Sequence, residues 1–365
     1  MRKLPVRTCF ALTCFAVCSG LAFAQGSPFS SDQSILGTFQ SVIASTVPAN
    51  GDLNPYGVAF VPTDFPSGGS IQAGNVLVSN FNASSNLEGT GTTIVSFSST
   101  GQQSLFATST SIGLSTALGV LSRGFVVVGN LPVSYPGGVS TPGLGSLQVF
   151  DRNGKFVTMF EDPTLLDSPW DLTINDQGST AQVFVSNVLS GTVTRLNLSI
   201  SNSGVTLVSK TQIGSGFGHQ LIPAIVAVGP TGLAYDPGRD LLYVASTADN
   251  EIFAIGDPVR RTTSAGTGFL VFADPTHLHG PLGLTLAPNG DLITANGDGV
   301  NAGGTANDLV EFTKEGMLVA TYQLDGGNPG AAFGIASTVS RGAIRFAAVD
   351  DDLNSLTIWT LRLPF

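Results

Sequence analysis

The sequence predicts an all-β protein, a six-bladed β-propeller whose last blade is closed by an N-terminal strand. Three observations carry this prediction: a short motif recurs six times, an apolar strand follows each copy, and an unmatched strand precedes the first copy. The composition agrees, because glycine is abundant, with 45 of 365 residues, and Thr, Ser and Val fill the segments between the glycines. No stretch of the sequence combines Leu, Ala, Glu and Lys with a helical period.

The recurring motif is clearest in two copies, which read GPTGLAY over residues 229–235 and GPLGLTL over residues 280–286. Four more degenerate copies share a Gly or Asp with them at one marker position. The marker residues are 57, 119, 171, 232, 283 and 334, and they lie 51 to 62 residues apart. A repeat of about this length is typical of propeller blades.

An apolar, β-branched run of strand length follows each copy and ends in turn residues. These runs cover residues 75–80, 125–130, 183–187, 241–246, 291–296 and 344–350. A third and a fourth strand come next, and in three copies their connecting turn ends in glycine, at Gly101, Gly154 and Gly316. Each repeat is therefore expected to form a four-stranded antiparallel sheet, and six such sheets arranged radially bury the faces that one cannot.

The sixth repeat lacks a fourth strand of its own. Its first three strands are expected at roughly 333–338, 343–349 and 355–362. Residues 35–45, which precede the first motif, resemble the fourth strands at 155–160 and 317–322. We therefore expect residues 35–45 to complete the last blade and close the ring, which removes exposed strand edges.

Residues 1–24 have the order of a secretory signal peptide. Three positive charges lie in residues 2–7, an apolar stretch follows, and the sequence AFA at 22–24 places small residues before Gln25. We expect cleavage after Ala24, a single propeller domain over residues 25–365, and a secreted or periplasmic protein. The three cysteines all lie in residues 1–24, so the mature chain would hold neither a disulfide nor a thiolate metal site.

The charge balance indicates which partners to expect. The formal net charge is −10, with 25 acidic and 15 basic residues, and the expected cleavage makes the chain more acidic still. An acidic surface with few Lys and Arg argues against nucleic acid and, after cleavage, against membranes. The expected partner is a small molecule or an extracytoplasmic protein, and the expected oligomeric state is a monomer.

The segment GPTGLAYDPGRDLLYVA at 229–245, followed by NEIFAI at 250–255, resembles an NHL repeat. Residues 280–296 resemble a second copy, and the similarity to NHL-like and SMP-30-like six-bladed propellers extends over nearly all of residues 25–365. The resemblance implies the six-bladed fold. It leaves the function open, since such propellers include lactonases, metal-dependent lyases, sugar-acid hydrolases and protein-binding modules.

The loops that enter the inner strands, and the turns between second and third strands, are expected to share one face of the ring. Their amide, carboxylate and aromatic side chains could hold a ligand, or Ca²⁺ through oxygen atoms. The expected rim consists of Asn54, Tyr56, Asn80, Asn130, Trp170, Asn187, Asp249, Asn296, Asp298 and Asp351. The alternative is structural: the recurring Asn caps a turn, and the aromatic residues pack between blades.

The three histidines of the chain are the candidate metal ligands. His219 lies in the link from the third to the fourth blade, and His277 and His279 lie in the link from the fourth to the fifth. Residues two apart in an extended segment point to the same side. Three imidazoles can hold zinc and leave one position open for water. The alternative is that each imidazole hydrogen-bonds the backbone of its own loop.

Two functions follow as hypotheses. The first is an exported module that binds a ligand or a protein. The second is a lactonase-like, metal-dependent hydrolase or lyase at the channel mouth, with zinc or calcium as its cofactor. The sequence favours the first, because it contains no nucleophile elbow, no phosphate-binding P-loop and no HExxH motif.

Overall fold

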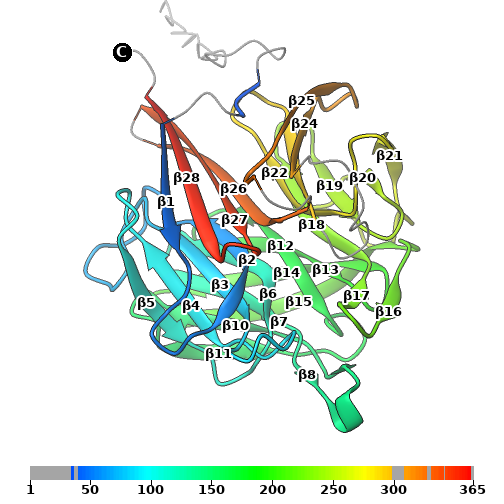
Figure 1. Cartoon of the computed structure of the whole chain (residues 1–365). Helices are drawn as coiled ribbons and strands as arrows, with labels where there is room; N and C mark the ends of the chain where they lie inside the picture. The colour runs from blue at the N-terminus through cyan, green and yellow to red at the C-terminus, as the bar shows by residue number, and fades with distance from the viewer. Residues whose placement is uncertain (1–33, 37–39, 298–307, 327–329, 341, 363–365) are drawn as a thin grey trace, which may run out of the picture.

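The computed structural model describes residues 34–36, 40–297, 308–326, 330–340 and 342–362. These residues form six four-stranded antiparallel sheets around a common axis (Figure 1), and the innermost strands of neighbouring sheets lie side by side. The prediction of an all-β, six-bladed propeller is therefore confirmed.

Each blade has four strands, which lie side by side in order from the axis outward. The innermost strands are β2 (Leu53–Phe60), β6 (Leu114–Leu121), β12 (Pro169–Asp176), β18 (Pro230–Asp236), β22 (Pro281–Leu286) and β26 (Ala332–Ser340). The second strands are β3 (Val76–Asn82), β7 (Phe125–Asn130), β13 (Thr180–Asn187), β19 (Leu241–Ser246), β23 (Leu292–Asn296) and β27 (Ala343–Asp350). The third strands are β4 (Thr93–Phe97), β10 (Ser146–Asp151), β14 (Thr192–Ser201), β20 (Glu251–Gly256), β24 (Leu309–Phe312) and β28 (Ser355–Arg362). The outermost strands are β5 (Gln103–Thr108), β11 (Phe156–Phe160), β15 (Gly204–Ser215), β21 (Phe269–Phe272), β25 (Leu318–Tyr322) and β1 (Gln40–Ser45).

Two short hairpins extend from the blades. One pairs β8 (Val133–Ser134) with β9 (Thr141–Pro142), and the other pairs β16 (Gln220–Ile222) with β17 (Val226–Val228). The helical element within the described ranges is a single 3₁₀ turn at Pro136–Gly138. Among these residues no helix has the length and apolar character needed to cross a membrane.

The N-terminal strand closes the ring as predicted. β1 pairs along its whole length with β28, from Gln40 opposite Thr360 to Ser45 opposite Ser355. The predicted segment was longer than the strand itself. The N–H of Ile35 instead donates a hydrogen bond to Oε2 of Glu311 at 3.1 Å, so this part of the chain is held by the fifth blade.

Five of the six innermost strands have a β-bulge at the marker position of the repeat. In β6 the irregularity lies between Leu114 and Leu118, just before the marker Gly119. A Cβ atom at Gly283 or Gly334 would collide with a carbonyl oxygen of the next blade, that of Phe333 or Tyr56 respectively, which explains the recurring glycine. Blade three has Asp171 at this position. Its carboxylate accepts hydrogen bonds from the N–H groups of Leu172 and Leu233, at 2.7 and 3.3 Å, and bridges to the fourth blade.

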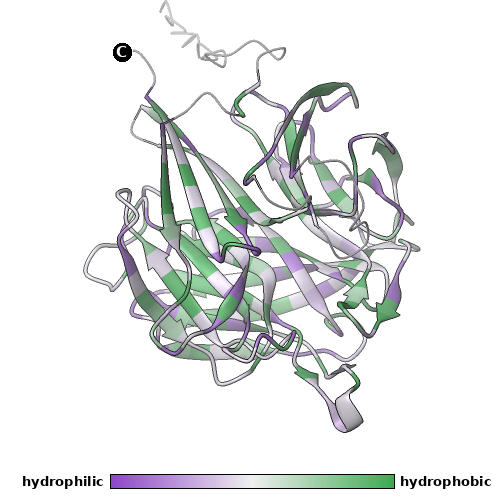
Figure 2. Cartoon of the chain, in the orientation of Figure 1, coloured by the Kyte–Doolittle hydropathy of each residue, from purple (hydrophilic) through white to green (hydrophobic). Residues whose placement is uncertain are grey.

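The blades are held together by apolar side chains packed between them. Apolar residues recur along the strands of every blade (Figure 2), and the strands β3, β4 and β7 are buried throughout. Aromatic residues supply much of this core, since Tyr243 and several phenylalanines are among its largest fully buried side chains. Stability then comes mainly from this buried apolar surface.

The carboxyl group of Asp350, at the end of β27, makes the stability depend on pH. It is 1% exposed and accepts one hydrogen bond from the N–H of Leu353, and burial raises its pKa to about 6. The pKa of this group is higher in the folded protein than in the unfolded protein, so the folded state favours the protonated carboxyl group. The stability that this group contributes is present at pH 4 and is lost as the pH rises through 6. We expect Asp350→Asn to raise the free energy of unfolding at pH 7.5 by about 2–3 kcal/mol.

Thermal melts between pH 4.5 and 8 measure this effect. The substitution should leave stability almost unchanged at the acid end of the range and increase it toward the alkaline end. Asp64→Asn is the matched control, because Asp64 is exposed and is not among the charged groups that act on Asp350. Parallel pH profiles for the wild-type and the Asp350→Asn protein would contradict the prediction.

Candidate functional site

A layer of packed aromatic rings lies across the axial channel. Tyr56 stacks on Phe81 and on Phe333, with ring centroids 4.4 and 4.7 Å apart. Trp170 meets Tyr56 and Phe81 edge-on, at 5.7 and 5.5 Å. The four residues come from the first, third and sixth blades and are almost fully buried, so they join these blades at the axis.

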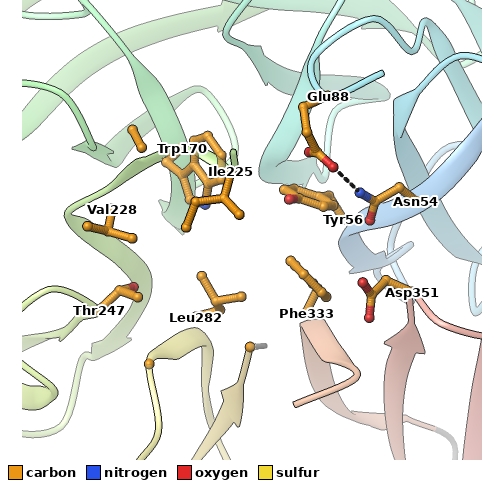
Figure 3. A pocket seen from close by; sticks show the side chains of 13 residues that line it. Asn54, Tyr56, Glu88, Trp170, Ile225, Val228, Thr247, Leu282, Phe333 and Asp351 are labelled. Carbon is orange, nitrogen blue, oxygen red and sulfur yellow. Dashed lines mark hydrogen bonds between the residues drawn. The ribbon is translucent and has the colours of Figure 1, made fainter. Parts of the chain in front are cut away.

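A cavity of about 130 Å³ lies against this aromatic layer, on the face where the innermost strands begin. Figure 3 shows two contrasting sides. Asn54, Glu88 and Asp351 lie together on one side, and Trp170, Ile225, Val228 and Leu282 lie on the other. The cavity therefore has a polar, acceptor-rich side and an apolar side.

Neighbouring amides hold the polar side in place. Asn54 and Asn82 each donate a side-chain N–H to Oε1 of Glu88, at 3.3 and 3.1 Å. The backbone of Asn54 is left-handed, with φ of 58°, and its N–H donates to the side chain of Asn354 at 2.7 Å. Asn suits this conformation, so the start of β2 aims its side chain at the cavity.

Two buried polar atoms at the cavity have no hydrogen-bond partner among the described residues: Oδ1 of Asn54 and Nε1 of Trp170. The side chains are 9% and 3% exposed, respectively. Leaving such a group unsatisfied costs about 1–3 kcal/mol. A molecule inside the cavity could satisfy both atoms.

The two hairpins border this site. β16–β17 supplies Val228 to the apolar side, and next to the cavity Val226 has a φ of 71°, a strained conformation for a β-branched residue. In the loop that joins β8 to β9, Tyr135 donates its hydroxyl to the backbone oxygen of Glu88 at 2.8 Å. Burial and the charge of Glu88 raise the pKa of Tyr135. The long segment between β7 and β10 therefore supports the Glu88 loop.

The chain matches no known protein-family profile and no curated protein sequence. It does match solved structures. The chain is a six-bladed β-propeller. Its structural relatives include the major allergen Mala s 1 of Malassezia sympodialis, which is 14% identical at a TM-score of 0.56, with 87% of this chain and 95% of that chain covered. A calcium-binding protein, regucalcin from Agrobacterium tumefaciens, is 12% identical at a TM-score of 0.52, with coverages of 90% and 96%. A luciferin-regenerating enzyme is 10% identical at a TM-score of 0.50, with coverages of 88% and 95%. At these identities the similarity concerns the fold alone.

The propeller brings four of the predicted rim residues to the cavity: Asn54, Tyr56, Trp170 and Asp351. The recurring asparagines lie elsewhere and are buried within the blades. Each donates its amide to a carbonyl oxygen of the loop that enters the same blade: Asn80 to Thr46, Asn130 to Ile112, Asn187 to Leu165 and Asn296 to His277. The bonded residues lie 18 to 34 positions apart, so these asparagines have a structural role, but they hold the entering loop rather than cap their own turn as the alternative stated. Asp249 accepts hydrogen bonds from Gly218 and Ser246, and Asp298 lies outside the described residues.

The three histidines face separate partners. Nδ1 of His219 lies 2.9 Å from the carbonyl oxygen of Phe217, and Nδ1 of His277 lies 2.7 Å from a carboxylate oxygen of Asp274. Nε2 of His279 lies 3.1 Å from the carbonyl oxygen of Thr276. Within the described part of the chain, no three His, Cys, Asp or Glu side chains gather closely enough to hold a metal ion. The three histidines are therefore not assembled into the expected zinc site.

Several residues of the cavity were not among the predicted rim residues. Glu88 lies in the long loop between β3 and β4, where nothing in its sequence context marks it. Leu282 and Phe333 did have a signal, because both directly precede a marker glycine, as Tyr56 does. Ile225 and Val228 belong to a hairpin outside the repeat, so the repeat pattern could not reveal them.

A second cavity, of about 290 Å³, occupies the channel on the other side of the aromatic layer. The innermost strands of all six blades line it, and hydroxyl groups such as those of Thr116 and Ser337 make it polar. Asp171 reaches it from the marker position of blade three, and burial holds the pKa of this carboxyl group well above its ordinary value. The aromatic layer therefore separates two compartments of different character.

Proposed function

We propose that this propeller binds a small molecule in the cavity between Trp170 and the side formed by Asn54, Glu88 and Asp351. The observation that carries the proposal is the pair of buried polar atoms, Oδ1 of Asn54 and Nε1 of Trp170, that lack a partner among the described residues. Both residues line the cavity, and a bound molecule that supplies a donor and an acceptor would recover the cost of their burial.

The surroundings support the same proposal. Ligand sites are concave and mostly apolar, with a few polar groups that fix the orientation of the ligand. Here aromatic and aliphatic side chains supply the apolar surface, and three polar side chains converge on one side. The strained backbone of Val226 also lies at this cavity, as strained residues often do at binding sites.

We rank binding ahead of metal-dependent hydrolysis or elimination, because no three His, Cys, Asp or Glu side chains gather at one point among the described residues. Three further parts of the proposal come from the sequence: export through a signal peptide at residues 1–24, an NHL-like repeat, and a monomeric state. Sequencing the N-terminus of the exported protein tests the first of these, with Gln25 as the expected first residue.

A cavity-filling substitution tests the binding proposal. Ile225 is partly exposed at the edge of the cavity, so Ile225→Trp should fill the space with little cost to the fold. In a ligand-observed NMR screen of small fragments, we expect several to bind the wild-type protein and to lose at least ten-fold in affinity for the variant.

The matched control is Leu221→Trp, which adds the same side chain to the same hairpin at a position that is 57% exposed and outside the cavity. It should bind the fragments like the wild type. If every fragment bound Ile225→Trp as tightly as the wild type, the binding site would have to lie elsewhere.

A further inference from the structure

We infer that the ligand of this cavity is a small organic cation, an amine whose ammonium group faces Glu88 and Asp351 and whose apolar body lies against Trp170. This inference rests on the proposed function and deepens it by naming the chemical class of the ligand. Three features of the cavity carry it: the sign of its charge, the way its carboxylates are held, and the apolar surface opposite them (Figure 3).

The charged side chains that line the cavity are all acidic among the described residues. Two of the described lining residues, Glu88 and Asp351, are carboxylic acids, and none of them is Lys, Arg or His. Oδ1 of Asn54 adds a buried hydrogen-bond acceptor on the same side. In a cavity with much apolar surface, these carboxylates attract a ligand cation and repel an anion more strongly than they would in open water. The lining thus favours a cation and opposes an anion.

The Glu88 carboxylate is held in position before any ligand arrives. Two amide groups, those of Asn54 and Asn82, donate to the same oxygen atom and thereby stabilise the charged form. The hydroxyl of Tyr135 holds the backbone of the same residue. A carboxylate fixed in this way loses little conformational entropy on binding, which favours a specific contact with an ammonium group.

The opposite side fits an apolar body. Trp170 and Leu282 face the carboxylates across the cavity, and Phe333 adds a second aromatic ring (Figure 3). An aryl or alkyl group would bury its surface here. The ligand is therefore an amine with an aryl or alkyl body of a few carbon atoms, rather than a bare metal ion or a polyol.

Three probes that share one body and differ in charge test the inference by titration calorimetry at pH 7. They are 2-phenylethylamine, its neutral analogue 2-phenylethanol, and the anion phenylacetate. We expect the amine to bind at least ten-fold more tightly than the alcohol and the anion to give no binding heat. Glu88→Gln and Asp351→Asn should each weaken amine binding about ten-fold and change alcohol binding less than two-fold. Asp352→Asn, at an exposed neighbouring position outside the cavity, should change neither.

The possible failures are distinguishable. Equal or tighter binding of the alcohol or the anion would overturn the cation assignment and leave the binding proposal standing. The same holds if fragments from the screen bind while all three probes do not. If neither the screen nor the probes find a ligand, both proposals fail. Alcohol binding and a thermal melt report whether a variant is folded, and Asp351→Asn gives an independent reading if Glu88→Gln does not fold.

Discussion

A protein that lacks residues 1–45 is expected to melt at least about 10 °C below the full chain and to aggregate when concentrated. The truncation removes β1, the strand that completes the sixth blade by pairing with β28 from Ser355 to Thr360. The hydrogen-bonding groups of β28 would then form an open sheet edge, which is a template for pairing with other chains. The contact of Ile35 with Glu311 would be lost at the same time, leaving a buried carboxylate with fewer donors.

A protein that lacks only residues 1–33 is the matched control, since it keeps both β1 and the Ile35 contact. Differential scanning calorimetry and light scattering compare the two proteins. We expect the control to melt within about 2 °C of the full chain and to stay monomeric. If the two truncated proteins melted at the same temperature, β1 would not be responsible for closing the ring.

Phe81→Ala is expected to lower the free energy of unfolding by about 3–5 kcal/mol. Phe81 is fully buried, stacks on Tyr56 and touches the edge of Trp170. Removing its ring leaves a void beneath two residues that line the ligand cavity. The variant should therefore also lose affinity for the ligand, because Tyr56 and Trp170 would no longer be held in place.

Phe81→Leu separates these effects, because it keeps most of the apolar volume. We expect it to cost about 1–2 kcal/mol and to retain ligand binding. Urea denaturation measures the stability of both variants, and the fragment titration measures their binding. A Phe81→Ala protein as stable as Phe81→Leu would mean that the aromatic layer contributes little to joining the blades.

The repeat pattern predicted the blades well because local rules govern them. Each innermost strand needs its marker residue where the next blade passes close by, as at Gly283 and Gly334, and that requirement is visible in the sequence. The closing strand was also predictable, since an unpaired fourth strand must complete the unfinished sheet. The predicted start of this strand, residue 35, was wrong. The N–H of Ile35 donates a hydrogen bond to Glu311, and no local sequence pattern connects these two residues.

The site was harder to predict, and the recurring asparagines show why. A side chain such as that of Asn187 can point into the channel or fold back to cap a loop carbonyl, and both choices have the same sequence signal. The histidines presented the same ambiguity. His277 contacts Asp274, three residues away, and local partners of this kind compete with any distant metal ligand.

By itself, the sequence determined that the chain forms six blades and that a strand from its N-terminal side closes them, because periodic apolar runs and marker glycines are local requirements. Only the tertiary structure decided which polar side chains share a cavity. Asn54 and Asp351 belong to the first and the last blade, and they meet because the ring closes between those blades. Asn54 and Asp351 are close because the whole ring curves back on itself, and this curvature cannot be predicted from the sequence of a single repeat.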